Sequence, residues 1–428
     1  MINLSDNEKI SAAVRWLKGK GLKGMAPPKG MSLSDVKVQN IRQIKRVIYY
    51  NAPVSRQRIT DELGLTLPSI TTAVSAMLAD GTLEELLPAR HTASAGGGRQ
   101  VHLLDFRSNA YYAVGVEVGP YRTTLAITDL RGHVRCEEII PVAPADYGAM
   151  LDYLCSAIDR LVRRSELEPA RIYGIGVGFP GFIDNKTGIT RSANRRQWIH
   201  KPLMQDLHDR LTLPVWADNN ARMRAVGREM FSSSRAPGTF AYFFVSKGLA
   251  CPLMIENLLY SGHRASAGEI GHNVILPGGP VCPTCGKRGC LEAVSSESAI
   301  LLAAAQAAGE GKSAMLAQML ADHGELSTEL LLEAQRQGDA AVCDILRSAV
   351  AYLGMEIANI FNFISPSLIT VDGLIFENQV NRDGLMRAVH QNLFGLTPDE
   401  AKVEFLPFNK MSGAYGAAAF VVRNCLLG

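Results

Sequence analysis

The stretch GEIGHNVILPGGPVCPTCGKRGCLEA, residues 268–293, decides how the rest of the chain is interpreted. It brings together one histidine and three cysteines, namely His272, Cys282, Cys285 and Cys290. Three thiolates and one imidazole form a donor set that suits tetrahedral Zn²⁺, whereas a loop of free surface thiols is the alternative. Because all four ligands come from the protein and no position is left for water, the pattern predicts a structural zinc site over residues 272–290.

Two carboxylates flank this loop, at Glu269 and Glu292. Held beside a folded metal loop, a pair of fixed acceptors is suited to recognising sugar hydroxyl groups. A solvated surface position is the ordinary fate of a glutamate, and the spacing alone leaves both interpretations open.

The composition is that of an ordinary globular protein, with 47% hydrophobic and 20% charged residues. A chain of 428 residues is long enough for two or three domains. No apolar run reaches the roughly 20 residues needed to cross a bilayer, and the first residues lack the apolar core of a signal peptide. We therefore expect a cytoplasmic protein.

Charge is distributed unevenly along the chain. Residues 1–105 contain 14 Lys and Arg against 9 Asp and Glu, which gives a net charge of +5, while residues 106–428 carry −2. Residues 1–35, rich in Gly, Pro and Lys after one short helical pattern, are expected to form a flexible basic arm. The basic bias of this end indicates a nucleic-acid partner.

Residues 36–105 contain three helical patterns followed by two strand-like runs that a Gly-rich segment joins. The helical patterns cover 38–50, 52–64 and 65–81. Ser55 and Thr66 are the candidate N-cap residues of the second and third helices. This order of elements predicts a winged helix-turn-helix.

The third helix is expected to present short polar side chains that let it enter a DNA major groove: Ser69, Thr71, Thr72 and Ser75. Arginines at the start of the second helix and beside the wing are placed to pair with phosphates: Arg56, Arg58, Arg90 and Arg99. The alternative is a solvated helix on a protein–protein module. The pattern and the charge together predict double-stranded operator DNA as the partner.

Residues 110–428 repeat one order of elements, a strand hairpin followed by a helix and a strand. The repetition predicts a duplicated α/β domain with a cleft between its halves, where ligands bind near the carboxyl ends of strands. The long apolar helix at 340–363 is a candidate dimer surface, and plain core is the equal alternative.

Five motifs resemble those of the ROK (repressor, open reading frame, kinase) family. They are AGEIGH with CGKRGCLEA, GVGFPGFID, SANRRQW, ADNNA and GAYGAAA. With the helix-turn-helix ahead of them, the resemblance covers residues 38–428 and points to the family's transcriptional-repressor branch. It implies an actin-like (ribonuclease H-like), two-lobed sugar-kinase-type domain with zinc beside a sugar pocket.

The resemblance also implies the sugar contacts, which at matching positions are Gly181, Asn194, Asn219, Asn220, Glu269, His272 and Glu292. His272 would then serve the metal with one ring nitrogen and the pocket with the other. One departure is the presence of Pro283 and Thr284 between the first two cysteines, where family members usually have a single residue.

Catalytic family members have a base aspartate at the position of Asn220, and an amide cannot accept the proton of a sugar hydroxyl. Asp218 lies two residues earlier, in a segment where side chains alternate in direction, and is not expected to replace it.

The phosphate-binding loops of the kinases are also altered. In the first, Pro120 removes an amide donor and Tyr121 adds bulk. The second keeps only Gly248, and in the third Asp372 places a carboxylate where nucleotide would lie. The resemblance therefore implies a domain that does not transfer phosphate.

The predicted function is that of a sugar-responsive DNA-binding regulator, a repressor of carbohydrate-metabolism genes, that works as a homodimer or a dimer of dimers. An active ATP-dependent sugar kinase with an accessory DNA-binding domain is the alternative. A third hypothesis is a constitutive DNA-binding protein whose cleft is vestigial.

Overall fold

The computed structural model describes residues 33–86, 102–184, 187–193, 196–232, 234, 236–263 and 266–428. The chain divides into two compact units, Met1–Asp105 and Phe106–Leu426. The predicted basic arm lies outside the described residues up to residue 32. None of the described helices is both long enough and apolar enough to cross a bilayer.

The N-terminal unit combines three helices with a small antiparallel sheet. The helices are α2 (Leu33–Asn51), α3 (Arg56–Leu63) and α4 (Leu67–Ala79). The sheet has the order β1-β3-β2, with strands β1 (Val54–Ser55), β2 (Leu83–Leu86) and β3 (Leu103–Phe106). The sequence predicted only β2 and β3, because the two residues of β1 are too few to produce an alternating pattern.

Each of these helices buries an apolar face, and the buried residues include Ile44, Ile48, Ile59, Ile70, Val74 and Met77. Ser55 caps α3 as predicted, since its hydroxyl oxygen accepts a hydrogen bond from the Arg58 amide at 3.2 Å. Thr66 occupies the N-cap position of α4, but its hydroxyl pairs with the Ser69 hydroxyl at 2.9 Å and makes no hydrogen bond to the helix backbone.

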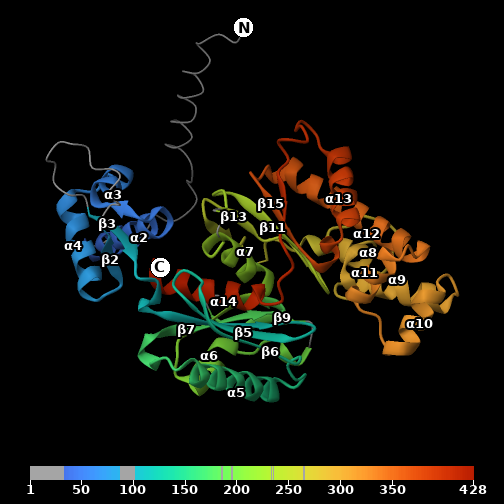
Figure 1. The fold of residues 1–428 in the computed structure, drawn as a ribbon, viewed down its shortest axis with the longest axis horizontal. Coiled ribbons are helices and arrows are strands. Elements are labelled where there is room, and N and C mark those ends of the chain that lie inside the picture. Colours follow the sequence, from blue (N-terminus) through green and yellow to red (C-terminus); the bar gives the residue numbers. More distant parts are fainter. Residues whose placement is uncertain are drawn as a thin grey trace, which may run out of the picture. The chain divides into compact units, whose positions relative to one another are not determined.

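The first lobe of the C-terminal unit is built on a five-stranded sheet of order β10-β7-β4-β5-β6. Its strands are β4 (Tyr112–Val118), β5 (Thr123–Asp129), β6 (Val134–Ile140), β7 (Ile172–Phe179) and β10 (Val215–Asn219). The strands β4, β5 and β6 form an antiparallel meander, β7 pairs with β4 in parallel, and β10 pairs with β7 in parallel. The helices α5 (Tyr147–Ser165) and α6 (Leu203–Leu211) pack on one face of this sheet (Figure 1).

The second lobe repeats this topology strand for strand. Its sheet has the order β14-β13-β11-β15-β16, with β11 (Phe240–Val245), β13 (Leu253–Ile255), β14 (Leu258–Tyr260), β15 (Ile369–Asp372) and β16 (Val403–Phe405). Again the first three strands are antiparallel, and the last two add in parallel. The duplication read from the sequence is therefore present in the fold, and the short β12 (Leu249–Ala250) pairs with β11 in the same antiparallel register as β13.

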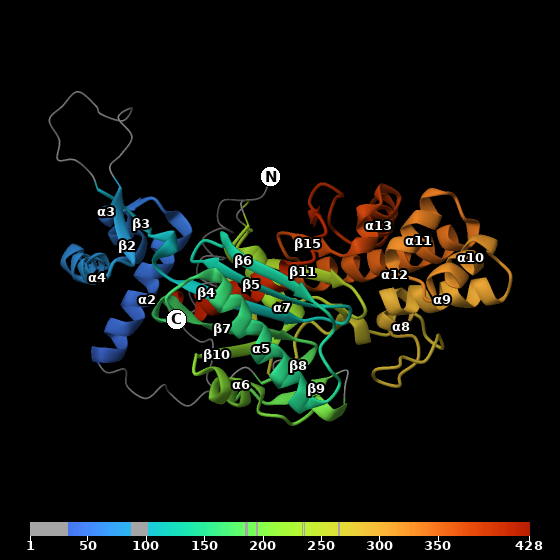
Figure 2. The same ribbon diagram turned by 60° about the horizontal axis from the view of Figure 1, so that its bottom comes forward.

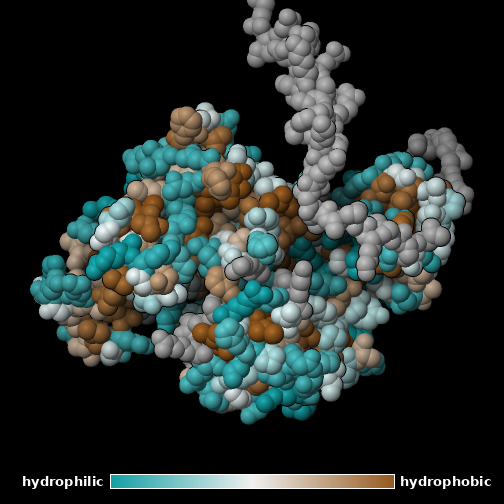
Figure 3. Space-filling model, turned by 180° about the vertical axis from the view of Figure 1, so that it is seen from behind, coloured by the Kyte–Doolittle hydropathy of each residue, from teal (hydrophilic) through white to brown (hydrophobic). Residues whose placement is uncertain are grey.

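The second lobe also carries a group of helices that gathers beside its sheet (Figure 2). They are α8 (Leu291–Ser295), α9 (Glu297–Gly309), α10 (Ala314–His323), α11 (Thr328–Arg336), α12 (Ala340–Ile364) and α13 (Gln379–Asn392). The predicted long helix is α12, and its apolar face, with Leu346, Leu353 and Ile357, is buried in the core. Near its C-terminal end Phe363 is 90% exposed. On the face in Figure 3, exposed apolar residues are interspersed with hydrophilic ones.

Two helices, α7 (Asn220–Met230) and α14 (Ser412–Val422), lie between the two sheets (Figure 1). Glycines allow α14 to lie directly on the first sheet, because a Cβ at Gly115 would meet the Ala414 carbonyl oxygen at 1.9 Å and one at Gly176 would meet the Ala417 oxygen at 2.1 Å. This close approach explains the small residues of the GAYGAAA motif.

Candidate metal centre and interlobe site

The four predicted metal ligands come together in the second lobe. One ligand atom from each of His272, Cys282, Cys285 and Cys290 lies within 4.8 Å of all the others. The Cys285 and Cys290 sulfurs are 3.5 Å apart, and the Cys282 sulfur lies 3.8 Å from His272 Nδ1. The imidazole therefore presents Nδ1 to the cluster.

Backbone hydrogen bonds fold this loop tightly around the cluster. The Gly286 amide donates to the Cys282 carbonyl at 2.9 Å, and the Cys282 amide donates to the Lys287 carbonyl at 2.7 Å. Gly289 has φ +76°, and a Cβ there would lie only 1.7 Å from the Leu276 carbonyl oxygen. Only glycine fits that position, which brings the last cysteine back to the first.

The donor set fits a tetrahedral metal. Bonds of about 2.3 Å from Zn²⁺ to sulfur place neighbouring ligand atoms roughly 3.7 Å apart. The two shortest ligand separations given above bracket that value. Cys282 and Cys290 are buried and Cys285 is exposed, so the cluster lies at the edge of the lobe.

The two carboxylates beside the metal loop have different surroundings. Glu292 Oε1 accepts a hydrogen bond from the Thr284 hydroxyl at 2.6 Å, so one of the two residues inserted between the first cysteines holds this glutamate. For the Glu269 carboxylate, no hydrogen-bond partner occurs among the described residues. Burial, and next the charge of Glu292, raise the pKa of Glu269 to about 7, and the nearby Arg222 opposes the shift.

A second group of predicted site residues lies where β10 runs into α7. The Asn219 side chain accepts hydrogen bonds from the Ala221 and Arg222 amides as the N-cap of α7, and its amide nitrogen donates to the Gly181 carbonyl at 3.1 Å. Gly181 begins the hairpin of β8 (Gly181–Ile183) and β9 (Thr190–Ala193). Asn220 is the first residue of α7, so these residues form one corner, whereas Asn194 lies outside the described residues.

Arg222 connects this corner to the metal loop, because it lies close enough to Glu269 to influence its charge. Its guanidinium lies 2.9 Å from the Asp218 carboxylate, and it donates to the Ser261 hydroxyl at 2.6 Å. Asp218 is 1% exposed. Its carboxylate, at the end of β10, is therefore buried against an arginine in the first turn of α7.

A cavity of about 240 Å³ opens next to this corner. Its walls come from the β4–β5 turn, the residue before Gly181, a buried tryptophan and one lysine of the second lobe, and they include Gly119, Pro120, Pro180, Trp198 and Lys247. Glu269, His272 and Glu292 do not line it. The cavity is thus a neighbour of the polar site, and polar atoms make up more of its lining than apolar ones.

A buried arginine joins the two lobes. Arg224 on α7 donates to both oxygens of Glu117, at 2.9 and 2.8 Å, and to Asp372 at 3.1 Å. Tyr242 donates to the same Asp372 oxygen at 2.6 Å. Glu117 belongs to β4 of the first lobe and Asp372 to β15 of the second.

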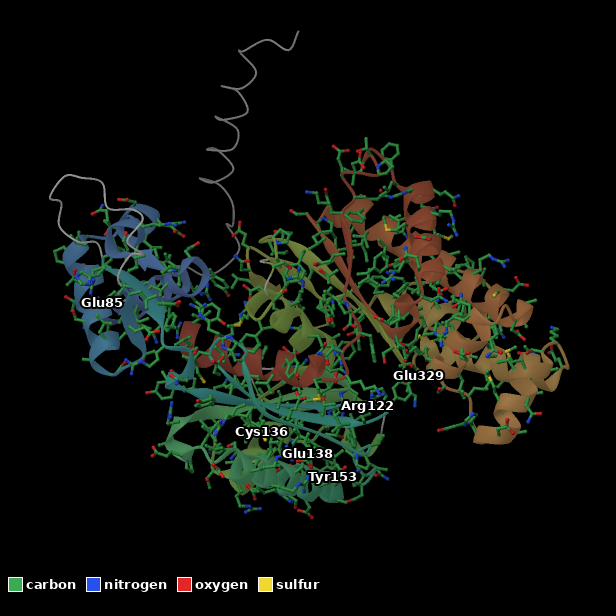
Figure 4. All side chains as sticks on the ribbon, in the orientation of Figure 1. Glu85, Arg122, Cys136, Glu138, Tyr153 and Glu329 are labelled. Atoms are coloured by element: carbon green, nitrogen blue, oxygen red, sulfur yellow. The ribbon has the colours of Figure 1, made fainter. Side chains whose placement is uncertain are left out.

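A second interlobe contact forms between the β4–β5 turn and the start of α9. Tyr121 lies close enough to the Glu297 carboxylate for the two groups to interact, and the Ser246 hydroxyl donates to that carboxylate at 3.4 Å. Burial raises the pKa of Glu297 to about 7. Arg122 follows Tyr121 and Glu329 lies on α11, and both charges act on this tyrosine (Figure 4).

In the N-terminal unit, the predicted DNA-contacting residues of α4 are all exposed, namely Ser69, Thr71, Thr72 and Ser75. Arg58 is exposed at the start of α3. Arg56 makes an ion pair with Glu85 of β2 at 2.6 Å, so its charge is already partly balanced. Arg90 and Arg99 lie outside the described residues.

Sequence reasoning did not find Arg224 or Tyr242, and it noted Thr284 without assigning it a role. The only available signal for Arg224 was a charged residue on the inward face of a helix between two apolar sheets. A burial pattern of that kind becomes visible only once the helix is placed between them.

Two sheets of the same strand order with helices between them define an actin-like, two-lobed α/β domain. A solved ROK family transcriptional regulator, a homologue of the E. coli MLC protein, shares this fold with a TM-score of 0.77 at 22% identity, covering 92% of this chain and 98% of that one. A ROK family glucokinase from Streptomyces griseus, solved with glucose and AMPPNP, has a TM-score of 0.64 at 25% identity over 72% of this chain and 98% of that one.

Residues 113–424 match the ROK family, and the chain belongs to it. It is 26% identical to a xylose repressor from Bacillus subtilis over 80% of this chain and 84% of that protein. It is 24% identical to the N-acetylglucosamine repressor of Escherichia coli O157:H7 over 80% of this chain and 82% of that protein. It is also 30% identical to a glucokinase from Halalkalibacterium halodurans over 62% of this chain and 81% of that protein.

Proposed function

We propose that this chain is a sugar-responsive DNA-binding regulator that represses carbohydrate-metabolism genes. The observation that carries the proposal is the presence of a separate helical unit ahead of the matched ROK region 113–424. Proteins named xylose repressor and N-acetylglucosamine repressor align with 80% of this chain. In the proposal, residues 36–105 bind operator DNA and residues 110–428 bind the sugar.

The exposed face of α4 supports the DNA-binding role. Its short hydroxyl side chains leave room for a helix to lie against base edges, and the alternation with buried Ile70, Val74 and Met77 orients that face away from the core. Arg58 at the start of α3 is placed to contact a phosphate. In the proposal the unit is a winged helix-turn-helix, and the whole protein is a homodimer on a palindromic operator.

The corner between α7 and the metal loop is the proposed sugar site. A sugar hydroxyl that donates to Glu269 would give this half-buried carboxylate the hydrogen bond that the described protein groups do not supply. With Nδ1 of His272 turned to the cluster, Nε2 faces away from it and is assigned to the sugar. The metal is proposed as structural Zn²⁺, which holds Glu292 and His272 in place.

The same contacts support the absence of phosphoryl transfer. Asn220 stands where catalytic relatives have the base, and the adjacent Asp218 is buried against Arg222. The first phosphate loop carries Pro120 and Tyr121, and Tyr121 lies beside Glu297. The side chains at the positions that would bind MgATP therefore already contact other protein groups.

An active sugar kinase is the second candidate, which the 30% identity to a glucokinase favours. The two candidates differ in what they do to ATP. Incubating the protein with MgATP and D-glucose, D-xylose or N-acetylglucosamine should release no ADP above background. Steady ADP release with any of these sugars would replace the regulator proposal with the kinase.

The direct test is fluorescence anisotropy with DNA from upstream of the chain's own gene, at a fixed ionic strength. We expect specific binding that survives competitor DNA and that one of the three sugars weakens. Arg58→Ala should lower the affinity and reduce the salt slope by about 1, because one phosphate contact is lost. Arg347→Ala, at an exposed ion pair on α12, is the matched control. Equal affinity for operator and random DNA would contradict the proposal.

A further inference from the structure

A buried group of four side chains spans the two lobes: Glu117, Arg224, Tyr242 and Asp372. Each is at most 8% exposed. The Arg224 guanidinium donates from Nε and Nη2 to Glu117 and from Nη1 to Asp372. All three of its nitrogens therefore make hydrogen bonds to carboxylates. The same guanidinium lies 4.6 Å above the Phe244 ring of β11. Arg224 therefore holds together one strand from each lobe.

The placement of α7 makes this bridge more than a local ion pair. Arg228, one turn further along α7, pairs with Glu404 of β16 at 2.6 Å, and Arg222 donates to Ser261 just after β14. These two contacts fasten α7 to the second lobe. Glu117 is the partner that Arg224 takes from the central strand of the first lobe.

Glu117 is also fixed from its other side. Its carboxylate rests against the first turn of α14, where a Cβ at Gly413 would lie 1.9 Å from the carboxyl carbon. The N-terminal end of a helix favours a negative charge. Glycine at 413 is thus required for the carboxylate to reach the arginine.

Electrostatics makes the bridge an all-or-none contact. Although burial alone disfavours its charge, Glu117 and then Asp372 raise the pKa of Arg224. Moving the lobes apart would leave buried carboxylates without their cation, which is costly, whereas the intact group satisfies them. A planar guanidinium can serve two carboxylates at once, and a lysine ammonium lacks that fork.

We propose that Glu117, Arg224 and Asp372, with Tyr242, form an interlobe clasp that sets the arrangement of the two lobes and transmits events at the start of α7 to it. Asn219 and Asn220 begin this helix at the proposed sugar site, and Arg224 lies one turn later. A ligand that shifts α7 acts on the clasp directly. The role of the clasp in setting the lobe arrangement stands alone, whereas its role in transmitting ligand binding rests on the proposed function.

The test is amide hydrogen exchange of the full chain without sugar, followed by mass spectrometry. In Arg224→Met, peptides of β4 and β15 should exchange about tenfold faster, and they should do so together, because both strands lose the same partner. Arg224→Lys should behave similarly, since it keeps the charge but not the two-sided geometry. Arg228→Met is the matched control and should affect β16 without affecting β4.

Arg224→Met leaves two carboxylates facing each other, so a charge-free variant guards against unfolding. In Glu117→Gln/Arg224→Met/Asp372→Asn no charge remains within this group of side chains, and faster exchange in β4 and β15 together is again expected. The clasp is overturned if exchange changes only within α7, or if Arg228→Met affects β4 as strongly as Arg224→Met does.

A second measurement separates the clasp from the proposed function. The sugar among D-glucose, D-xylose and N-acetylglucosamine that most raises the melting temperature of the wild type is added to wild type and to Arg224→Lys. We expect both to bind it, with protection of β4 and β15 in the wild type only. Equal protection in both would overturn the transmitting role. If none of the three sugars binds, the proposed function fails, while the sugar-free exchange still decides the clasp.

Discussion

Two groups of carboxylates, one beside the metal loop and one between the lobes, differ in how their hydrogen bonds are satisfied. At the metal loop, the Glu269 carboxylate has no hydrogen-bond partner among the described residues, and burial raises its pKa to about 7. In the interlobe clasp, Glu117 and Asp372 share one arginine, and Asp372 also accepts a hydrogen bond from Tyr242. A buried polar group that lacks a hydrogen-bond partner is stabilised by a ligand that supplies one. A group that already has its partners is destabilised when they move away. The first region is therefore suited to binding and the second to holding the lobes.

The largest effect is expected from removing a metal ligand. In Cys285→Ser the metal loop loses a thiolate, and the chain should lose most of its bound zinc. Since metal binding contributes to folding, the second lobe should lose stability on the order of 5 kcal/mol. Zinc content by elemental analysis and thermal unfolding check this result.

Cys343→Ser is the matched control, because this half-buried thiol lies on α12 outside the metal loop. It should retain one zinc per chain. A Cys285→Ser protein that keeps its zinc, or that unfolds no earlier than the control, would show that the loop does not depend on a metal.

The next effect concerns Glu297, whose pKa is raised from 4.5 to about 7 by burial. Because the folded state binds this proton more tightly than the unfolded state, stability is fully present below pH 4.5 and is lost as the pH rises to about 7. The loss should amount to about 3 kcal/mol. In Glu297→Gln the free energy of unfolding should fall less over this pH window.

Urea unfolding at several pH values measures the difference between wild type and variant. Subtracting the two curves removes the contribution of Glu269, whose pKa is shifted in the same direction. Glu329→Gln is an informative companion, since that charge is one of the causes that raise the pKa of Glu297. Parallel curves for wild type and Glu297→Gln would contradict the prediction.

The repeated topology was accessible to sequence reasoning because strand and helix periods recur twice along the chain. The metal ligands could be predicted because cysteine and histidine side chains bind metals, so a cluster of them in the sequence is itself a signal. Glu269 and Glu292 needed the family resemblance, since a glutamate in a loop is ordinarily solvated. The contacts of Arg224 were not accessible, because its partners lie 107 and 148 residues away along the chain.

A smaller effect is expected for ligand binding at Glu269. Glu269→Gln removes the charge but keeps an acceptor of similar size, so the sugar should bind about 10- to 100-fold more weakly, as for a lost charge-assisted hydrogen bond. Isothermal titration should use whichever of D-glucose, D-xylose and N-acetylglucosamine stabilises the wild type. Glu325→Gln, at an exposed position before α11, should bind like the wild type. Unchanged affinity in Glu269→Gln would remove the metal-loop carboxylate from the sugar site.

The smallest effect is expected from restoring a carboxylate at the start of α7. Asn220→Asp supplies the group that a phosphotransferase would use as a base, but a base contributes little unless the phosphate is positioned and its charge is stabilised. With Asp372 engaged by Arg224 and Tyr121 placed beside Glu297, no ADP release above wild type is expected. An aspartate in the first turn should instead stabilise α7 by about 0.5 kcal/mol, and a slightly higher melting temperature would show that the variant is folded. Measurable turnover of MgATP in this folded variant would mean that the interlobe clasp can still open to a nucleotide. The clasp carboxylates would then be available to a ligand, as Glu269 is, and the two groups would no longer differ.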